Sequence, residues 1–175
     1  MNRLQLATLL SWTGEAGIQG RKRLQKVVYF LQQAGCSLDC RYTLHHFGPY
    51  SRDVADICDE MVAAGLIDES GEPEPYSGYM QYAYKLKPQT VVLLEKTPET
   101  SMRSFRELGE RLIGENLWPL ELGSTILFFF QQSNDWSCAM RKACEFKNVS
   151  VDDNQSIAAL TLAKSHIREP LISVD

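Results

Sequence analysis

Four basic residues crowd the short segment from Gly20 to Lys26, and cations at this density could bind an anion. They are Arg21, Lys22, Arg23 and Lys26. The segment begins a predicted helix, where positive side chains oppose the helix dipole, so helix stability does not explain them. A phosphate or an acidic partner would be attracted both by the cations and by the helix N-terminus. The alternative is pairing within the chain, with acids such as Asp53, Asp56, Asp59 or Glu60.

Cysteine and histidine side chains could bind a metal or act as nucleophile and base. Cys36 and Cys40 precede His45 and His46, but structural zinc sites usually take ligands from two tightly spaced pairs, and the sequence has no C-x-x-C motif. The cysteines are better read as small buried hydrophobic residues. The motifs of serine hydrolases, zinc proteases, P-loop enzymes and dinucleotide-binding enzymes do not occur. We therefore predict no catalytic residue, no metal, no cofactor and a protein that is not an enzyme.

The segment Gly48-Pro49-Tyr50-Ser51 is the sharpest local motif. Pro49 fixes its own φ, and Ser51 suits the N-cap of a following helix. We expect a rigid turn between a strand and a helix, with Tyr50 packed over it. A role for Tyr50 on a surface that contacts a partner is the alternative.

Aromatic residues gather in two further places. Tyr76 and Tyr79 lie in or beside a segment that also carries four carboxylates, which would repel phosphate groups and so disfavour DNA binding. A tyrosine-rich surface without basic charge suits a protein interface instead. Phe128, Phe129 and Phe130 cannot all face one core from a single helix, so core packing and a partner interface both stay open for them.

Apolar periodicity predicts the elements that position these residues. Helices are expected over residues 3–14, 20–34, 52–64, 91–94, 100–115, 120–132, 136–146 and 152–167, and strands over 41–47, from 66, and over 79–86. Residues 68–78 contain two prolines and two glycines, so we expect a loop there. The order helix, helix, strand, helix, strand, loop, strand is that of a winged helix. We predict an α+β fold, mainly α, with a winged-helix-like module over residues 1–87 and a helical extension over 88–175 that shares its core.

Composition narrows the class of protein. The chain has 175 residues, of which 44% are hydrophobic and 23% charged, so it can bury a core without disulfides. Its net charge of −4 argues against nucleic-acid binding driven by bulk charge. Five cysteines and an N-terminus without a signal-peptide pattern predict a cytoplasmic protein. We expect no membrane segment, because no apolar run reaches the about 20 residues that a spanning helix needs.

The motifs together resemble a known family. The segment from Gly20 to Lys26 followed by Tyr29, the segment from Phe47 to Ser51, and the segment from Gly65 to Glu69 match the pattern of the YwgA-like winged-helix proteins of bacteria. The resemblance covers about residues 1–87, and a more distant likeness connects it to the Panacea-type antitoxin domain. Residues 88–175 match no pattern that we recognise.

The resemblance suggests a role in a larger assembly. Related small winged-helix subunits accompany SMC-like ABC ATPases and their effectors in anti-phage defence systems such as Lamassu. We therefore expect a non-enzymatic accessory subunit that docks on a larger bacterial complex. The alternative is a DNA-binding transcriptional regulator that reads DNA with the helix over residues 52–64. That helix carries four acids against Arg52, whereas base readers are usually Arg, Lys, Asn and Gln, so direct DNA contact is not favoured.

Overall fold

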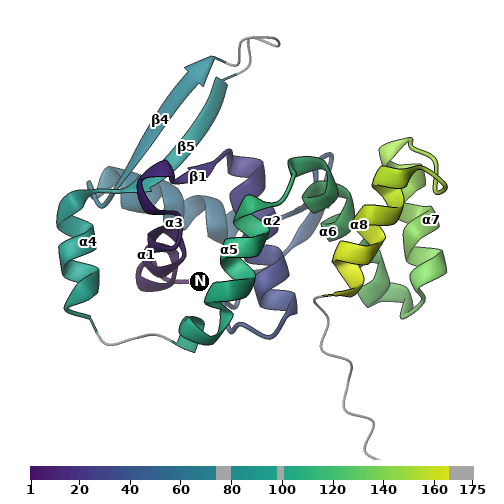
Figure 1. Cartoon of the computed structure of the whole chain (residues 1–175), viewed down its shortest axis with the longest axis horizontal. Coiled ribbons are helices and arrows are strands. Elements are labelled where there is room, and N and C mark those ends of the chain that lie inside the picture. The colour runs from purple at the N-terminus through teal and green to yellow at the C-terminus, as the bar shows by residue number, and fades with distance from the viewer. Residues whose placement is uncertain (74–79, 98–100, 166–175) are drawn as a thin grey trace, which may run out of the picture.

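A computed structural model describes residues 1–73, 80–97 and 101–165, and it confirms an α+β fold that is mainly helical (Figure 1). The described α-helices are α1 (Arg3–Ser11), α2 (Arg21–Gln33), α3 (Arg52–Ala63), α4 (Pro88–Glu95), α5 (Arg106–Gly114), α6 (Leu117–Ser133), α7 (Trp136–Lys147) and α8 (Asn154–Lys164). The other elements are the 3₁₀ helices η1 (Gly14–Ala16) and η2 (Ser101–Phe105) and the strands β1 (Ile18–Gln19), β2 (Thr43–His45), β3 (Gly48–Tyr50), β4 (Ile67–Pro73) and β5 (Met80–Leu86). The β4–β5 hairpin rises from a helical body, with α4 at one end and α7 and α8 at the other.

The larger sheet is antiparallel, with the strand order β1-β5-β4. The sequence pattern does not predict β1, because two residues are too few to show alternation. Strands β4 and β5 pair from Ile67 opposite Leu86 to Pro73 opposite Met80. The loop predicted for residues 68–78 is therefore wrong over residues 68–73, where cross-strand pairing outweighs weak strand propensity. The remainder of that segment lies outside the described residues, and the winged-helix assignment stays a prediction.

The smaller sheet is a tight hairpin, β2–β3, between α2 and α3. Thr43 pairs with Tyr50 and His45 with Gly48, so the chain turns at residues 46 and 47. The turn predicted over residues 48–51 is wrong, because Gly48–Tyr50 is a strand. Gly48 has a φ of +88°, and a Cβ added there would lie 2.5 Å from Oγ1 of Thr125 on α6. A larger side chain would force the hairpin away from α6, which explains the glycine.

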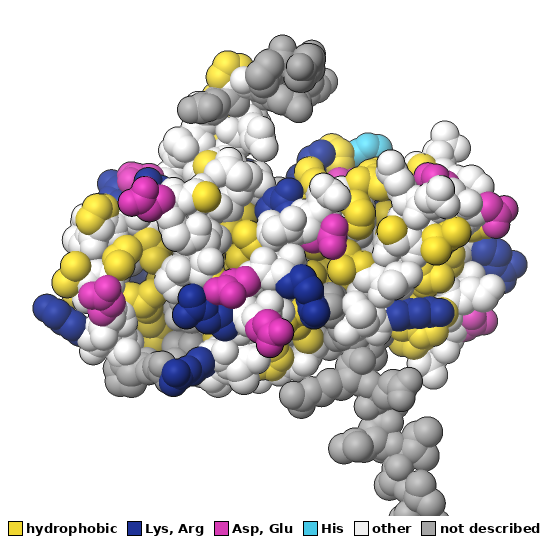
Figure 2. All heavy atoms as spheres, viewed as in Figure 1, with side chains coloured by type: hydrophobic (Ala, Val, Ile, Leu, Met, Phe, Trp, Pro, Cys, Tyr) yellow, Lys and Arg dark blue, Asp and Glu magenta, His cyan; other side chains and the backbone are white. Residues whose placement is uncertain are grey.

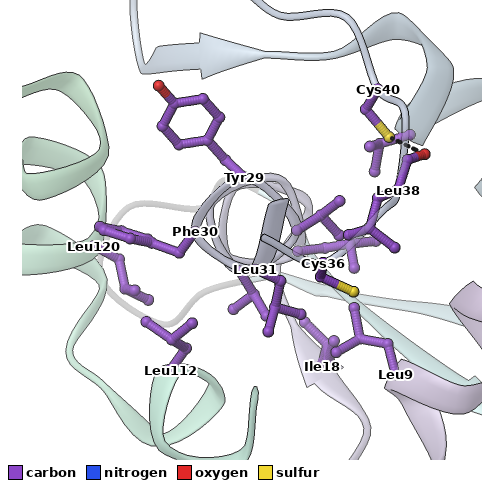
Figure 3. Packing of buried hydrophobic residues seen from close by; sticks show 14 of the residues in the cluster. Leu9, Ile18, Tyr29, Phe30, Leu31, Cys36, Leu38, Cys40, Leu112 and Leu120 are labelled. Carbon is purple, nitrogen blue, oxygen red and sulfur yellow. Dashed lines mark hydrogen bonds between the residues drawn. The ribbon is translucent and has the colours of Figure 1, made fainter. Parts of the chain in front are cut away.

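Helix α2 lies at the centre of the hydrophobic core. Figure 3 looks along this helix and shows Tyr29, Phe30 and Leu31 leaving it in different directions, with Phe30 directed at Leu120 of α6. All three side chains are at most 1% exposed. One cluster of buried hydrophobic side chains extends from α1 to α8, so the elements on both sides of residue 88 contribute to it.

The helix ends largely follow the predicted signals. The Ser51 hydroxyl accepts a hydrogen bond from the N–H of Val54, which confirms it as the N-cap of α3. Gly35, with a φ of +98°, follows α2 as expected. Three predicted helices are shorter than expected: α1 ends at Ser11, the helix expected over residues 100–115 starts as the 3₁₀ helix η2 before α5, and the one expected over 152–167 is α8, which ends at Lys164.

Candidate functional site

Arg21 binds an acid of the chain itself, although not one of those expected. Its Nε and Nη2 atoms lie 3.1 and 2.5 Å from Oε1 of Glu69 on β4. The Tyr84 hydroxyl donates to the same oxygen at 2.6 Å. Burial alone would raise the pKa of Glu69, but the hydrogen bonds from Tyr84 and Arg21 hold it below its usual value. Three acids of α3 bind other arginines, in the pairs Asp53–Arg41, Asp56–Arg52 and Glu60–Arg3.

The other three cations of the segment point in separate directions. Arg23 donates to two backbone carbonyl groups at the end of α5. Lys22 places its ammonium 3.5 Å from the centroid of the Phe47 ring. Lys26 is only 2% exposed, and its ammonium donates to the Pro49 carbonyl at 2.6 Å. The four residues therefore have different partners, and Lys22 and Lys26 contact the β2–β3 hairpin.

The corner between the hairpin and α3 is held by two polar side chains of α2. The Gln25 amide donates to the Ser51 carbonyl and accepts from the Ser51 N–H, both at 2.9 Å. Lys26 holds the carbonyl of Pro49, two residues earlier. These bonds give partners to buried backbone groups, and the Ser51 carbonyl also accepts from the Ala55 N–H at 3.4 Å. The Gly20–Lys26 segment and the Phe47–Ser51 segment are therefore two sides of one contact.

A second lysine reaches the same hairpin from α7. Lys147 donates to the His46 carbonyl at 2.9 Å and to Oε1 of Glu121, on α6, at 2.5 Å. The Lys147 and Glu121 side chains are 6% and 9% exposed, so this is a buried ion pair. Burial lowers the pKa of Lys26 to about 7; the Glu121 carboxylate opposes this effect, and the ammonium groups of Lys147 and Lys22 add to it.

A cavity of about 340 Å³ opens beside this corner, between α2, the β2–β3 hairpin and α3. Phe47 and Tyr50 of the hairpin region and Tyr84 of β5 give it aromatic walls. The apolar side chains that α3 adds are Val54, Ala55 and Cys58. Most of the lining is therefore apolar, as is usual for a small-molecule site.

Charged and polar side chains complete the lining of the cavity. Three of the candidate cations belong to it, namely Arg21, Lys22 and Lys26. Asp59 of α3 and His45 of β2 also line it. The His45 ring stacks on that of Tyr50, with centroids 4.7 Å apart and planes at 25°. The cavity thus combines flat rings with cations.

Comparison with known proteins places the chain in a family. No family model matches it. A Bacillus subtilis (strain 168) protein described as "Uncharacterized protein YwgA" is 30% identical to it over 125 residues, which are 71% of this chain and 72% of that protein. The chain belongs to the YwgA-like family. Since 125 aligned residues exceed the 87 that carry the sequence motifs, the YwgA similarity must also include part of residues 88–175, where the motifs suggested none.

The geometry gives a structural reason for the motifs of this YwgA-like chain. Gln25 and Lys26, in the first motif, hold the backbone of Pro49 and Ser51, in the second. The polar side chains of the first motif and the backbone groups of the second therefore supply hydrogen-bond partners to each other. The partners that the motifs did not reveal are Glu121 and Lys147, which lie in the second half of the chain.

The residues predicted to form an interface have different surroundings. Tyr50 is half-buried and lines the cavity beside His45, so it is available to a ligand there. Tyr76 and Tyr79 lie outside the described residues. The prediction that they contact a partner therefore stays a prediction.

The three phenylalanines of α6 mostly pack within the molecule. Phe128, Phe129 and Phe130 are each half-buried against the core. The Phe130 ring stacks on Trp136 of α7 with centroids 3.8 Å apart, and Phe129 meets Phe146 edge-on at 6.4 Å. These contacts join α6 to α7. They cover part of the surface of the rings, so only the remaining surface could contact a partner.

The thiols and acids do not come together in a metal site within the described part of the chain. Among the described residues, no group of three or more His, Cys, Asp or Glu side chains could hold an ion. Cys36 and Cys58 are buried, and burial raises the pKa of their thiols to about 11 and about 12. Thiols with such pKa values are poor nucleophiles and poor metal ligands at neutral pH.

A helix that crosses a lipid bilayer needs about 20 mostly apolar residues. In the part of the chain that the structure describes, no helix combines the length and the apolar character that crossing a membrane requires.

Proposed function

We propose that this chain is a non-enzymatic accessory subunit that docks on a larger bacterial protein complex. The observation that carries this proposal is the surface of α4. Val91, Val92 and Leu93 follow one another there and are 39%, 48% and 58% exposed. Figure 2 shows hydrophobic side chains gathered at this end of the molecule.

Three consecutive exposed residues spread over about 200° of a helix circumference, so only a narrow side of α4 faces the body of the protein. That side includes Thr90, which is buried and donates to the Leu66 carbonyl. Contiguous exposed apolar side chains commonly mark a protein-interaction site. Covering the exposed parts of the three side chains would contribute roughly 2–4 kcal/mol to docking.

The likeness to accessory subunits of anti-phage systems suggests an SMC-like ABC ATPase as the partner. Winged-helix-like architecture of the first 87 residues suits such a subunit, and the order of α1, α2, α3 and the β4–β5 hairpin supports that assignment. The DNA-binding alternative has less support, because three of the five exposed residues of α3 are the acids Asp56, Asp59 and Glu60. The guanidinium of Arg52 on the same helix is bound to Asp56 at 2.8 Å.

The proposal is tested by affinity capture from the native host, with mass spectrometry of what is retained. Leu93→Asp should lose a stoichiometric large partner that the wild type retains. Ile157→Asp changes a side chain on α8 that is 50% exposed, and this control should retain the partner. Equal retention by both variants, or salt-dependent binding of duplex DNA without any protein partner, would sink the proposal.

A further inference from the structure

We propose that the cavity between α2, the β2–β3 hairpin and α3 binds a small planar aromatic ligand that carries one anionic group. This goes beyond the docking function, because the cavity is built from other residues than the exposed surface of α4. The anionic group is a phosphate or a carboxylate, and the structure supports either.

The size and walls of the cavity specify the body of the ligand. A volume of about 340 Å³ is that of a pocket for a small molecule rather than for a folded segment. Phe47, Tyr50 and Tyr84 supply rings, and rings pack well against a flat partner. His45 and Tyr50 are already stacked nearly parallel, which presents a flat surface to the cavity.

The charges specify the other part of the ligand. Arg21 lines the cavity, but Glu69 already neutralises it. Lys22 has a ring contact with Phe47, and Lys26 has one hydrogen bond to a carbonyl, so both ammonium groups keep donors for a further acceptor. Three cations thus line the cavity against the single carboxylate of Asp59, and of these Arg21 is held by the Glu69 carboxylate, so the lining favours a ligand with an anionic group over a cationic one.

The walls are also held in place before a ligand arrives. Gln25 fixes the backbone at Ser51, just after β3, and Lys147 fixes it at His46, so the exit and the turn of the hairpin are both tied to helices. A site that is rigid in advance loses little conformational entropy on binding. The hairpin corner therefore acts as a scaffold for the cavity.

The test uses the full chain alone and measures binding by calorimetry and by NMR shifts of backbone amides. Adenosine and uridine monophosphates represent aromatic phosphates, and indoleacetate represents aromatic carboxylates. Adenosine, uridine and inorganic phosphate are the partial ligands. We expect one of the two anionic classes to bind and to shift the amides of His45, Tyr50 and Ala55, and we expect each partial ligand to bind at least about tenfold more weakly.

Three variants locate the ligand. Lys22→Gln removes a lining charge and should weaken binding about tenfold or more, while Lys22→Arg should restore it. Lys142→Gln removes an exposed lysine of α7 that does not line the cavity, and it should bind as the wild type does. Ala55→Phe fills the cavity without changing its charge and should abolish binding; circular dichroism checks that the variant folds.

The proposal is overturned if neither anionic class binds at millimolar concentration. It is also overturned if Ala55→Phe binds with wild-type affinity, or if Lys142→Gln loses as much as Lys22→Gln. None of these measurements involves a protein partner, so their failure leaves the docking proposal untouched, and failure of the docking test leaves these measurements valid.

Discussion

Replacing Glu121 by Gln tests the buried charges behind the hairpin most directly. The Glu121 carboxylate lies 2.5 Å from the Lys147 ammonium, and these side chains are 9% and 6% exposed. Lys26, 2% exposed, is the second buried ammonium that the carboxylate stabilises. Glu121→Gln removes the negative charge that compensates both.

Removing one member of a buried ion pair usually costs about 3–5 kcal/mol. A glutamine keeps an acceptor oxygen for Lys147, and Lys26 loses its proton readily because its pKa is about 7. We therefore expect a loss near the lower limit, about 3 kcal/mol of the free energy of unfolding. That is a large share of the roughly 5–15 kcal/mol that stabilises a typical domain.

Urea unfolding followed by circular dichroism measures this loss. The matched control is Glu110→Gln, which breaks an exposed pair with Arg106 on α5 and should change the stability by at most about 0.5 kcal/mol. Lys147→Met in the Glu121→Gln background should restore most of the stability, because it removes the ammonium left without a counter-charge. The reasoning is refuted if Glu121→Gln costs no more than Glu110→Gln, or if the two changes at 121 and 147 are additive.

Two further predictions concern Lys26 and a close helix contact. The pKa of Lys26 is about 7 in the folded protein and 10.5 ordinarily, so the unfolded chain binds more protons between these values. This group therefore makes the free energy of unfolding rise from about pH 7 to pH 10. Urea unfolding of Lys26→Met across that range should lack this rise, and a pH profile identical to that of the wild type would contradict the assignment. A Cβ on Gly109 of α5 would lie 2.3 Å from the Trp12 ring, so Gly109→Ala should cost about 1–3 kcal/mol. Gly114→Ala, in open space at the end of the same helix, should instead stabilise by up to about 1 kcal/mol, and thermal melts that rank the two variants the other way would contradict the packing.

Local signals in the sequence predicted the elements well where they are strong. Helices α2 and α3 have clear apolar faces and end signals, and Ser51 caps α3 as expected. Strand β1 was not predicted, because its two residues form a strand only by pairing with β5. The residues 68–73 look like a loop and become β4 for the same reason, since the partner strand decides the conformation.

The candidate site was predictable in its residue types but not in its contacts. The basic cluster at residues 21–26 includes Lys22 and Lys26, but their partners, Phe47 and Pro49, lie on the hairpin. The residues next to Lys26 in the sequence do not indicate that its side chain is buried. Glu121 could have been found, because a single acid within an apolar helix requires a partner. That partner is Lys147, which is 26 residues away in the sequence, and no local pattern connects them.

The hairpin that lines the cavity also depends on a residue that is synthesised much later than the hairpin itself. Its turn carbonyl at His46 is bound by Lys147, 101 residues later. During translation, α2, the hairpin and α3 emerge long before α7, and contacts of such high sequence separation form late. The Glu121 carboxylate that stabilises the Lys26 ammonium is on α6, so it too is synthesised after the hairpin. The first 87 residues therefore leave the ribosome as an incomplete unit, and the corner reaches its final form only when the last third of the chain folds against it.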